Sequence, residues 1–201
     1  MVKNPITSHF QSADPIFFTL LQKISLQPIS KRPPAKYFQS LCHEIIGQQL
    51  SGKVADVLCD RFDKLFGKRS VTPQGVLKFS EEKLRNTGMS WAKARFIRDL
   101  AQKVSDQSVQ LSQLDQLSND DVIVELTKVK GIGPWTAEMF LMFTLGREDI
   151  FSFGDLGLAK AIQKLYSLKK KPTRKQLEKI TKRWSPYRTH AALVLWKSLD
   201  G

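Results

Sequence analysis

The sequence predicts an all-α protein, and three observations support this prediction. Apolar residues recur at helical spacing, most clearly in residues 36–46. Cap residues precede such segments, and no alternating apolar–polar run competes with them. Residues 137–145 and 189–199 are apolar on most sides, which is typical of helices in the middle of a bundle. Together these patterns predict about ten helices.

The expected helix starts follow in chain order. Asp14 is an expected N-cap with proline at the first helical position after it. Gly47 weakens the end of the next helix, after which a serine is placed to cap residues 52–66. Thr72 and Pro73 start a further short turn, and Ser90 precedes the helical segment 91–104. Ser118 with Asp121 and Thr173 with Gln176 resemble capping boxes.

Length and charge limit the function classes. A chain of 201 residues forms one large domain or two closely joined lobes. Its net charge of +13 indicates a polyanionic partner, most commonly nucleic acid, although a merely basic surface is the alternative. Residues 160–188 hold eleven Lys or Arg and one acid, Glu178. Such a one-sided cluster favours phosphate contacts.

The remaining composition indicates an intracellular protein. No apolar run approaches the roughly 20 residues that span a bilayer, so we expect no membrane association. The first fifteen residues lack the apolar segment of a signal peptide. Cys42 and Cys59 both lie in apolar helical patterns and are expected to be buried thiols, without a disulfide or a metal.

The stretch KVKGIGPWTA, residues 128–137, places a glycine turn before a helix. A dinucleotide-binding turn would need a third glycine where Thr136 stands, and a P-loop would need Gly-Lys-Ser/Thr. What remains is a helix–GIG–helix hairpin with Pro134 in the first turn of its second helix. Its backbone N–H groups can bind a phosphate, or the segment is a plain corner between two helices.

Two further stretches each have a structural and a functional interpretation. Asp155 follows a glycine at a helix start, where it is either an N-cap or a carboxylate kept ionised in a cleft by the helix dipole. Residues 45–55, IIGQQLSGKVA, place two glutamines and a leucine between two helices, as caps or as a wedge that enters the minor groove. The three histidines show no ligand spacing and are expected to be structural or surface residues.

Five stretches, in this order, resemble the helix-hairpin-helix (HhH-GPD) DNA glycosylases, and most closely their 3-methyladenine DNA glycosylase II family: IIGQQLS, GMSWAKARFI, LTKVKGIGPWTAEMF, FGDLGL and RWSPYRTHAALVLW. The resemblance extends from about residue 14 to residue 199. It implies two helical lobes with the active site in the cleft between them. One lobe is expected to contain residues 36–125, and the other residues 1–35 together with 126–201, which carry the hairpin and the catalytic aspartate.

The resemblance also implies roles for individual residues. Asp155 matches the catalytic aspartate, and Gln49, with Leu50 as the alternative, matches the wedge. The pocket walls are expected at Trp135, Met139 and Tyr187. Further DNA contacts are expected at Ser51, Lys93, Gly131, Gly133 and Thr136. The backbone carbonyls of Thr127, Val129 and Ile132 are expected to hold a monovalent cation, Na⁺ or K⁺.

The implied activity is the flipping and hydrolytic excision of alkylated purines from double-stranded DNA by a monomeric enzyme of base excision repair. Related lyases carry a nucleophilic lysine directly after the hairpin, where this chain has Trp135, so no lyase activity is expected. Both cysteines precede residue 60, so we expect no iron–sulfur cluster and no required cofactor. The alternatives are a non-catalytic helix-hairpin-helix protein that binds DNA structures, and a helical protein-interaction module.

Overall fold

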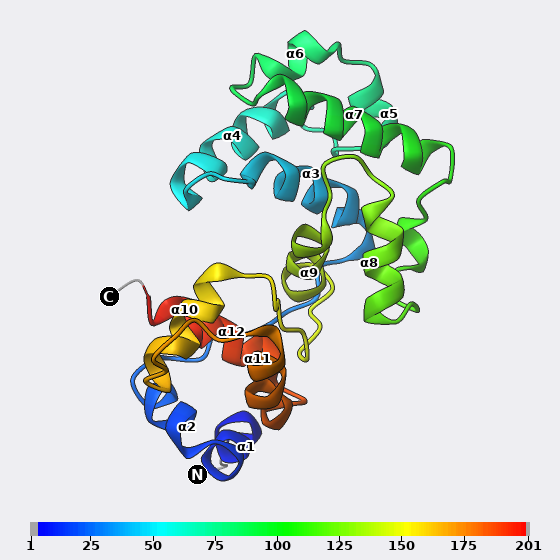
Figure 1. The fold of residues 1–201 in the computed structure, drawn as a ribbon. Coiled ribbons are helices and arrows are strands. Elements are labelled where there is room, and N and C mark those ends of the chain that lie inside the picture. The colour runs from blue at the N-terminus through cyan, green and yellow to red at the C-terminus, as the bar shows by residue number, and fades with distance from the viewer. Residues whose placement is uncertain (1–3, 200–201) are drawn as a thin grey trace. The chain divides into compact units, whose positions relative to one another are not determined.

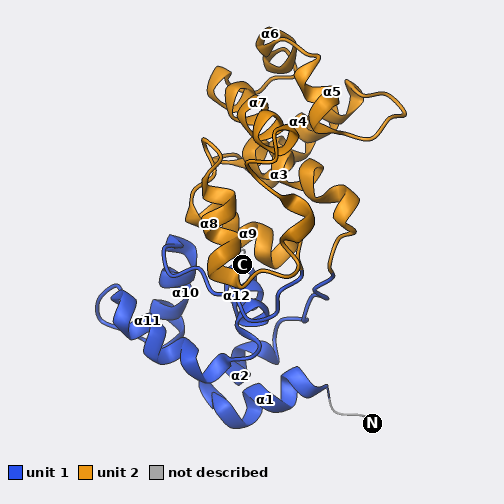
Figure 2. Cartoon of the chain, turned by 90° about the vertical axis from the view of Figure 1, so that its right-hand side faces the viewer, with its two compact units in different colours: residues 1–30, 146–201 blue, residues 31–145 orange. Residues whose placement is uncertain are grey.

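The computed structural model describes residues 4–199, which form helices joined by loops (Figure 1). This part of the chain contains twelve α-helices, three 3-10 helices and no strand, which confirms the all-α prediction. None of these helices is long and apolar enough to cross a membrane. The chain divides into two compact units: unit 1 is Met1–Ser30 with Gly146–Gly201, and unit 2 is Lys31–Leu145 (Figure 2).

Unit 2 is built around a long helix, α7 (Trp91–Ser105), on which several shorter helices pack. Helices α5 and α6 lie against α7, and α3 contacts α4, α7 and α9. The remaining elements of the unit are η1 (Pro34–Lys36), α3 (Tyr37–Gly47), α4 (Gly52–Lys64), α5 (Pro73–Leu77), α6 (Glu81–Arg85), η2 (Leu111–Gln113), α8 (Asn119–Thr127) and α9 (Pro134–Phe143).

Residues 31–35 fall in unit 2, where η1 packs on α3, and the division also differs from the expected lobes in the placement of residues 126–145. These residues belong with the central helices, because α9 packs on both α3 and α8. The rings of Tyr37 and Phe140 meet edge-on at 5.7 Å between α3 and α9, and both side chains are buried. The hairpin is therefore part of unit 2, whereas Asp155 belongs to unit 1.

Unit 1 is formed by an N-terminal and a C-terminal segment of the chain. Its elements are α1 (Pro5–Ala13), α2 (Pro15–Leu21), α10 (Leu156–Leu165), α11 (Arg174–Thr181), η3 (Lys182–Trp184) and α12 (Arg188–Lys197). Phe17 packs against Phe10 at 4.6 Å and against Trp184 at 5.1 Å, and all three rings are fully buried. Buried Asp14 accepts hydrogen bonds from the Trp184 indole at 2.8 Å and from the Tyr166 hydroxyl, so it fixes this aromatic core.

Most of the expected caps are confirmed. Asp14 accepts the Phe17 N–H at 3.1 Å, and Thr173 forms a complete capping box with Gln176. Ser51 occupies the N-cap position of α4 but makes no side-chain capping hydrogen bond. The two cysteines are free thiols; Cys42 is buried and Cys59 half-buried, and burial raises the pKa of the Cys59 thiol to about 11.

Candidate functional site

The expected hairpin is present in unit 2 as α8, residues 128–133 and α9. Gly131 adopts φ +85°, in the left-handed region that favours glycine. A Cβ added there would lie 2.1–2.6 Å from ring carbons of Phe96 on α7. Gly131 is therefore required both by the turn and by close packing against α7.

Gly133 is different, because nothing inside the protein requires a glycine there. Its φ is −95°, and a Cβ at this position would meet no atom of residues 4–199 within 4 Å. It is the exposed N-cap of α9, at the helix end where the first-turn N–H groups have no partner within the helix. An uncrowded helix N-terminus of this kind lets an anionic group approach the backbone closely.

The predicted residues on α9 divide by exposure. Trp135 is 44% exposed, whereas Met139, one turn further along the same face, is only 4% exposed. Thr136 is also buried. Trp135 thus presents an aromatic surface to solvent beside the hairpin, and Met139 is available only as a buried wall.

Side chains of helix α7 form hydrogen bonds with the backbone of the hairpin. The Asp99 carboxylate accepts the Lys130 N–H at 2.9 Å and lies 3.1 Å from the Lys103 ammonium. Lys103 in turn donates to the carbonyl of Lys128, just past the end of α8. A cation there complements the negative end of the α8 dipole.

The carbonyls expected to bind a monovalent cation lie in this same turn. The Val129 carbonyl accepts the Ile132 N–H at 3.1 Å, which closes the turn after Thr127 ends α8. Uncharged carbonyl oxygens are suitable ligands for hard cations. The donor chemistry therefore fits an alkali cation, and the ion itself stays a prediction.

The wedge candidates lie in the loop between α3 and α4. Gln49 is exposed and has φ +59°, a left-handed conformation that is costly for a residue other than glycine. Leu50 is 37% exposed, and Ser51 is exposed as well. Both candidates thus project from the surface of unit 2.

Lys93, an expected DNA contact, already has partners within unit 2. Its ammonium donates to the carbonyl of Ile46 at 2.8 Å and to that of Gln48 at 2.7 Å. Burial lowers the pKa of this ammonium. Its observed role is therefore to hold the end of α3 and the loop that follows, while a contact with DNA stays a prediction.

Asp155 is the N-cap of α10 in unit 1, which agrees with the first of its two interpretations, a helix cap. Its Oδ1 accepts the N–H of Leu158 at 2.8 Å and the indole N–H of Trp196 at 3.2 Å. A Cβ at position 157 would lie 3.1 Å from that oxygen, so a larger residue would crowd it. The Leu158 backbone and the Trp196 side chain thus both orient the carboxylate.

Trp196 was missed by sequence reasoning, whereas the predicted Tyr187 is the N-cap of α12. Tyr187 precedes the helix, and its ring packs edge-on against His9 at 5.3 Å and His190 at 6.0 Å. Trp196 lies nine positions further along the chain, about 13 Å along the helix axis. Trp196 therefore places an aromatic side chain beside the Asp155 carboxylate, and Tyr187 as a pocket wall stays a prediction.

An exposed apolar side chain adjoins Asp155 in the chain. Leu156, the first residue of α10, is 69% exposed. Leaving a leucine in water forgoes the free energy that burial would provide. An exposed apolar group next to an oriented carboxylate is a combination suited to ligand contact, and no periodicity in the sequence marks it.

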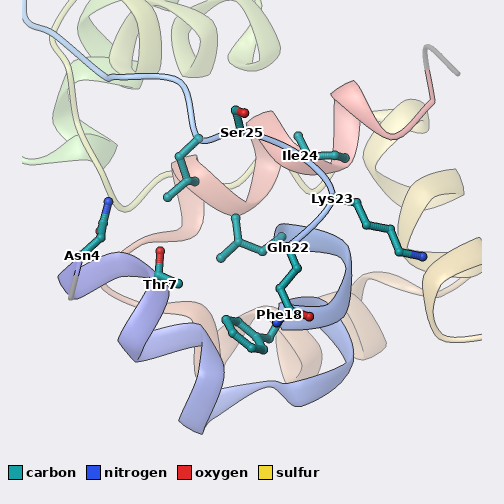
Figure 3. A pocket seen from close by; sticks show the side chains of 9 residues that line it. Asn4, Thr7, Phe18, Gln22, Lys23, Ile24 and Ser25 are labelled. Atoms are coloured by element: carbon teal, nitrogen blue, oxygen red, sulfur yellow. The ribbon is translucent and has the colours of Figure 1, made fainter. Parts of the chain in front are cut away.

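Unit 1 also contains a hollow between α1, α2 and the segment that follows α2 (Figure 3). Its volume is about 340 Å³, and Asn4, Thr7, Phe18 and Lys23 are among its lining residues. None of the predicted site residues lines it. We therefore place the candidate chemistry at Asp155 and not in this hollow.

Comparison with known proteins identifies the family to which this chain belongs. Residues 42–186 match the family described as HhH-GPD superfamily base excision DNA repair protein. DNA-3-methyladenine glycosylase 1 of Schizosaccharomyces pombe is 32% identical over 80% of this chain and 72% of its own length. YfjP of Bacillus subtilis, provisionally named a DNA-3-methyladenine glycosylase, is 33% identical over 78% of this chain, which spans 56% of that protein.

Solved structures have the same fold. The DNA-3-methyladenine glycosidase of Bacillus halodurans superposes with a TM-score of 0.83 at 36% identity, covering 98% of this chain and 89% of that one. The 3-methyladenine DNA glycosylase Mag1 of S. pombe, solved in complex with abasic DNA, gives 0.82 at 28% identity and covers 98% of both chains.

Proposed function

Because the chain belongs to the HhH-GPD superfamily of base excision DNA repair proteins, we propose that it is a DNA glycosylase. Its substrate is duplex DNA containing alkylated purines of the 3-methyladenine type, and its reaction is hydrolysis of the N-glycosidic bond. The observation that carries this proposal is the Asp155 carboxylate, oriented by Leu158 and Trp196. A protein that only binds DNA would need this residue as no more than a helix cap.

The hairpin holds the DNA backbone in this proposal. Backbone N–H groups at Gly133 and the start of α9 donate to a phosphate without reading the sequence. The open space at Gly133 supports this role. A monovalent cation on the carbonyls of Thr127, Val129 and Ile132 would supply positive charge that reinforces the turn.

The lesion must leave the base stack before it can react. Extrusion costs a few kcal/mol, and less when alkylation has weakened the base pair. Gln49 or Leu50 fills the gap, since both project from unit 2. The exposed ring of Trp135 attracts a cationic alkylpurine by about 0.5–2 kcal/mol through its π face.

The bond between C1′ and the purine nitrogen then breaks, and the base leaves with the electron pair. A positively charged alkylpurine departs as a neutral base, so a general acid is not required. The sugar develops oxocarbenium character, which the Asp155 carboxylate stabilises electrostatically. Water adds to C1′ and loses a proton, for which Asp155 is the acceptor.

The proposed enzyme is monofunctional, because Trp135 stands where related lyases carry lysine. Its direct test is incubation with methylated duplex DNA, followed by an aldehyde-reactive probe that counts abasic sites. Abasic sites should accumulate with time and enzyme concentration. Tight binding to the methylated duplex without abasic sites would instead favour the non-catalytic DNA-binding alternative.

Replacing Trp196 with phenylalanine should lower the single-turnover excision rate about tenfold, the size expected for losing one hydrogen bond to a charged group. Phenylalanine retains an aromatic ring but cannot donate to Asp155. Trp91→Phe, at an exposed tryptophan of unit 2, is the matched control and should react at the wild-type rate. Equal rates for Trp196→Phe and the wild type would remove Trp196 from the site.

The basic segment of unit 1 should contribute to DNA affinity through charge alone. Lys169, Lys170 and Lys171 are all exposed in the loop before α11. Changing the three to glutamine should reduce the slope of log K against log salt by up to about 0.9 for each phosphate that the protein no longer neutralises. Binding titrations at several salt concentrations measure this slope. An unchanged slope would show that these lysines do not bind phosphates.

A further inference from the structure

Gln48, directly before the wedge candidates, connects their loop to the hairpin. Its side-chain amide donates to the Gly131 carbonyl at 2.8 Å and to the Thr136 hydroxyl at 3.1 Å. These acceptors lie 83 and 88 residues further along the chain. One side chain thus contacts both the glycine turn and the first turn of α9.

The backbone of the same loop is held from the other side by α7. The Lys93 ammonium binds the carbonyls of Ile46 and Gln48. The same helix packs Phe96 near Gly131. Helix α7 is therefore a common support for the wedge loop and the hairpin.

We propose that Gln48 and Lys93 are positioning residues that hold the Gln49–Leu50 loop in fixed register with the hairpin. The inference rests on the proposed function. Phosphate binding at the hairpin then places the wedge opposite the base step it must enter, without a separate search by the loop. Neither residue needs to touch the lesion for this role.

The conformation of the loop explains why it needs this support. Gln49 has φ +59°, which surrounding structure must enforce. Exposed residues of a loop without such restraints occupy many conformations, and ordering them during insertion would reduce the rate. A displacement of about 1 Å in a positioned group can lower a rate a hundredfold. Hydrogen bonds from Gln48 and Lys93 fix the loop in advance.

The test measures separately how tightly the hairpin binds the DNA backbone and how fast the Gln49–Leu50 loop inserts into the base stack. Gln48→Met keeps the length of the side chain and removes its donors, and Thr136→Val removes one acceptor. Gln113→Met, at an exposed glutamine of unit 2, controls for the chemical change. A fluorescent base analogue beside a stable abasic-site analogue reports insertion without requiring catalysis. The affinity for an undamaged duplex reports how tightly the hairpin binds the DNA backbone.

We expect Gln48→Met to bind undamaged duplex within about twofold of wild type and to show about tenfold slower insertion, as the removal of two hydrogen bonds implies. Thr136→Val should show a smaller slowing in the same direction, and Gln113→Met none. Lys93→Met should also slow insertion, and Lys93→Arg should restore most of the rate because arginine still donates to carbonyls.

Wild-type insertion rates in both Gln48→Met and Lys93→Met would overturn the inference. The inference would also be overturned if Gln48→Met lost affinity for undamaged duplex as strongly as it lost insertion rate, because that pattern indicates general damage to the hairpin. If Gln48→Met fails to fold, the Thr136→Val and Lys93 variants decide the matter. Failure of the proposed function is a separate result, since the wild type would then release no base whatever these insertion rates are.

Discussion

Replacing Asp155 with asparagine should lower base release from methylated DNA by about a hundred- to a thousandfold, the range seen when one electrostatic group of a transition state is removed. Asparagine has the same shape and is an equally good N-cap, so it can still accept the Leu158 and Trp196 N–H groups. What disappears is the negative charge opposite the developing sugar cation. Single-turnover measurement of free base gives the effect directly.

The same variant should keep its thermal midpoint and its affinity for duplex containing an abasic-site analogue. Asp120→Asn makes the same chemical change at an exposed position in the first turn of α8, and should retain full activity. If Asp155→Asn excises 3-methyladenine as fast as wild type, Asp155 is only a helix cap and the proposed mechanism is wrong.

Replacing Gly131 with alanine should destabilise unit 2 by about 2–4 kcal/mol, the combined size of a left-handed alanine and an overpacked contact. The alanine must adopt φ +85°, and its Cβ would lie 2.1 Å from a carbon of the Phe96 ring. The thermal midpoint should fall by roughly 5–15 °C for a chain of this size. Thermal unfolding followed by circular dichroism measures the change.

Gly133→Ala provides the contrasting control two residues away. Its backbone suits any residue, and a Cβ there meets no atom within 4 Å in the part of the chain that the structure describes, so its stability should match wild type within about 0.5 kcal/mol. Its affinity for DNA should fall several-fold, because the added methyl group lies where the phosphate approaches. Equal stability loss in the two variants would contradict the distinct roles assigned to the two glycines.

The fold was largely predictable because its signals are local. The Asp14 N-cap and the Thr173 capping box each involve residues within one helical turn, and both were recognised from sequence. The division into units was not, because it depends on α9 packing against α3 about a hundred residues earlier. Likewise, nothing in the sequence indicates that Ser51 lacks a capping hydrogen bond.

The candidate site was predictable only in its motif residues. The spacing of residues 131–136 and the glycine before Asp155 identified the hairpin and the carboxylate. Trp196 donates to Asp155 across 41 residues, and Gln48 reaches the hairpin across 83, so neither contact has a local signal. The interpretation of Lys93 changed for the same reason, because its carbonyl partners lie on another helix and the loop after it.

One measurement tests the central claim most directly: chromatographic identification of every base released from a methylated duplex, with parallel analysis of the DNA strand under borohydride. We predict release of free 3-methyladenine, a strand that stays intact until alkali is added, and no protein–DNA adduct. Release of no base, or strand cleavage with a trapped covalent adduct, would contradict the assignment of this chain as a monofunctional alkylpurine DNA glycosylase.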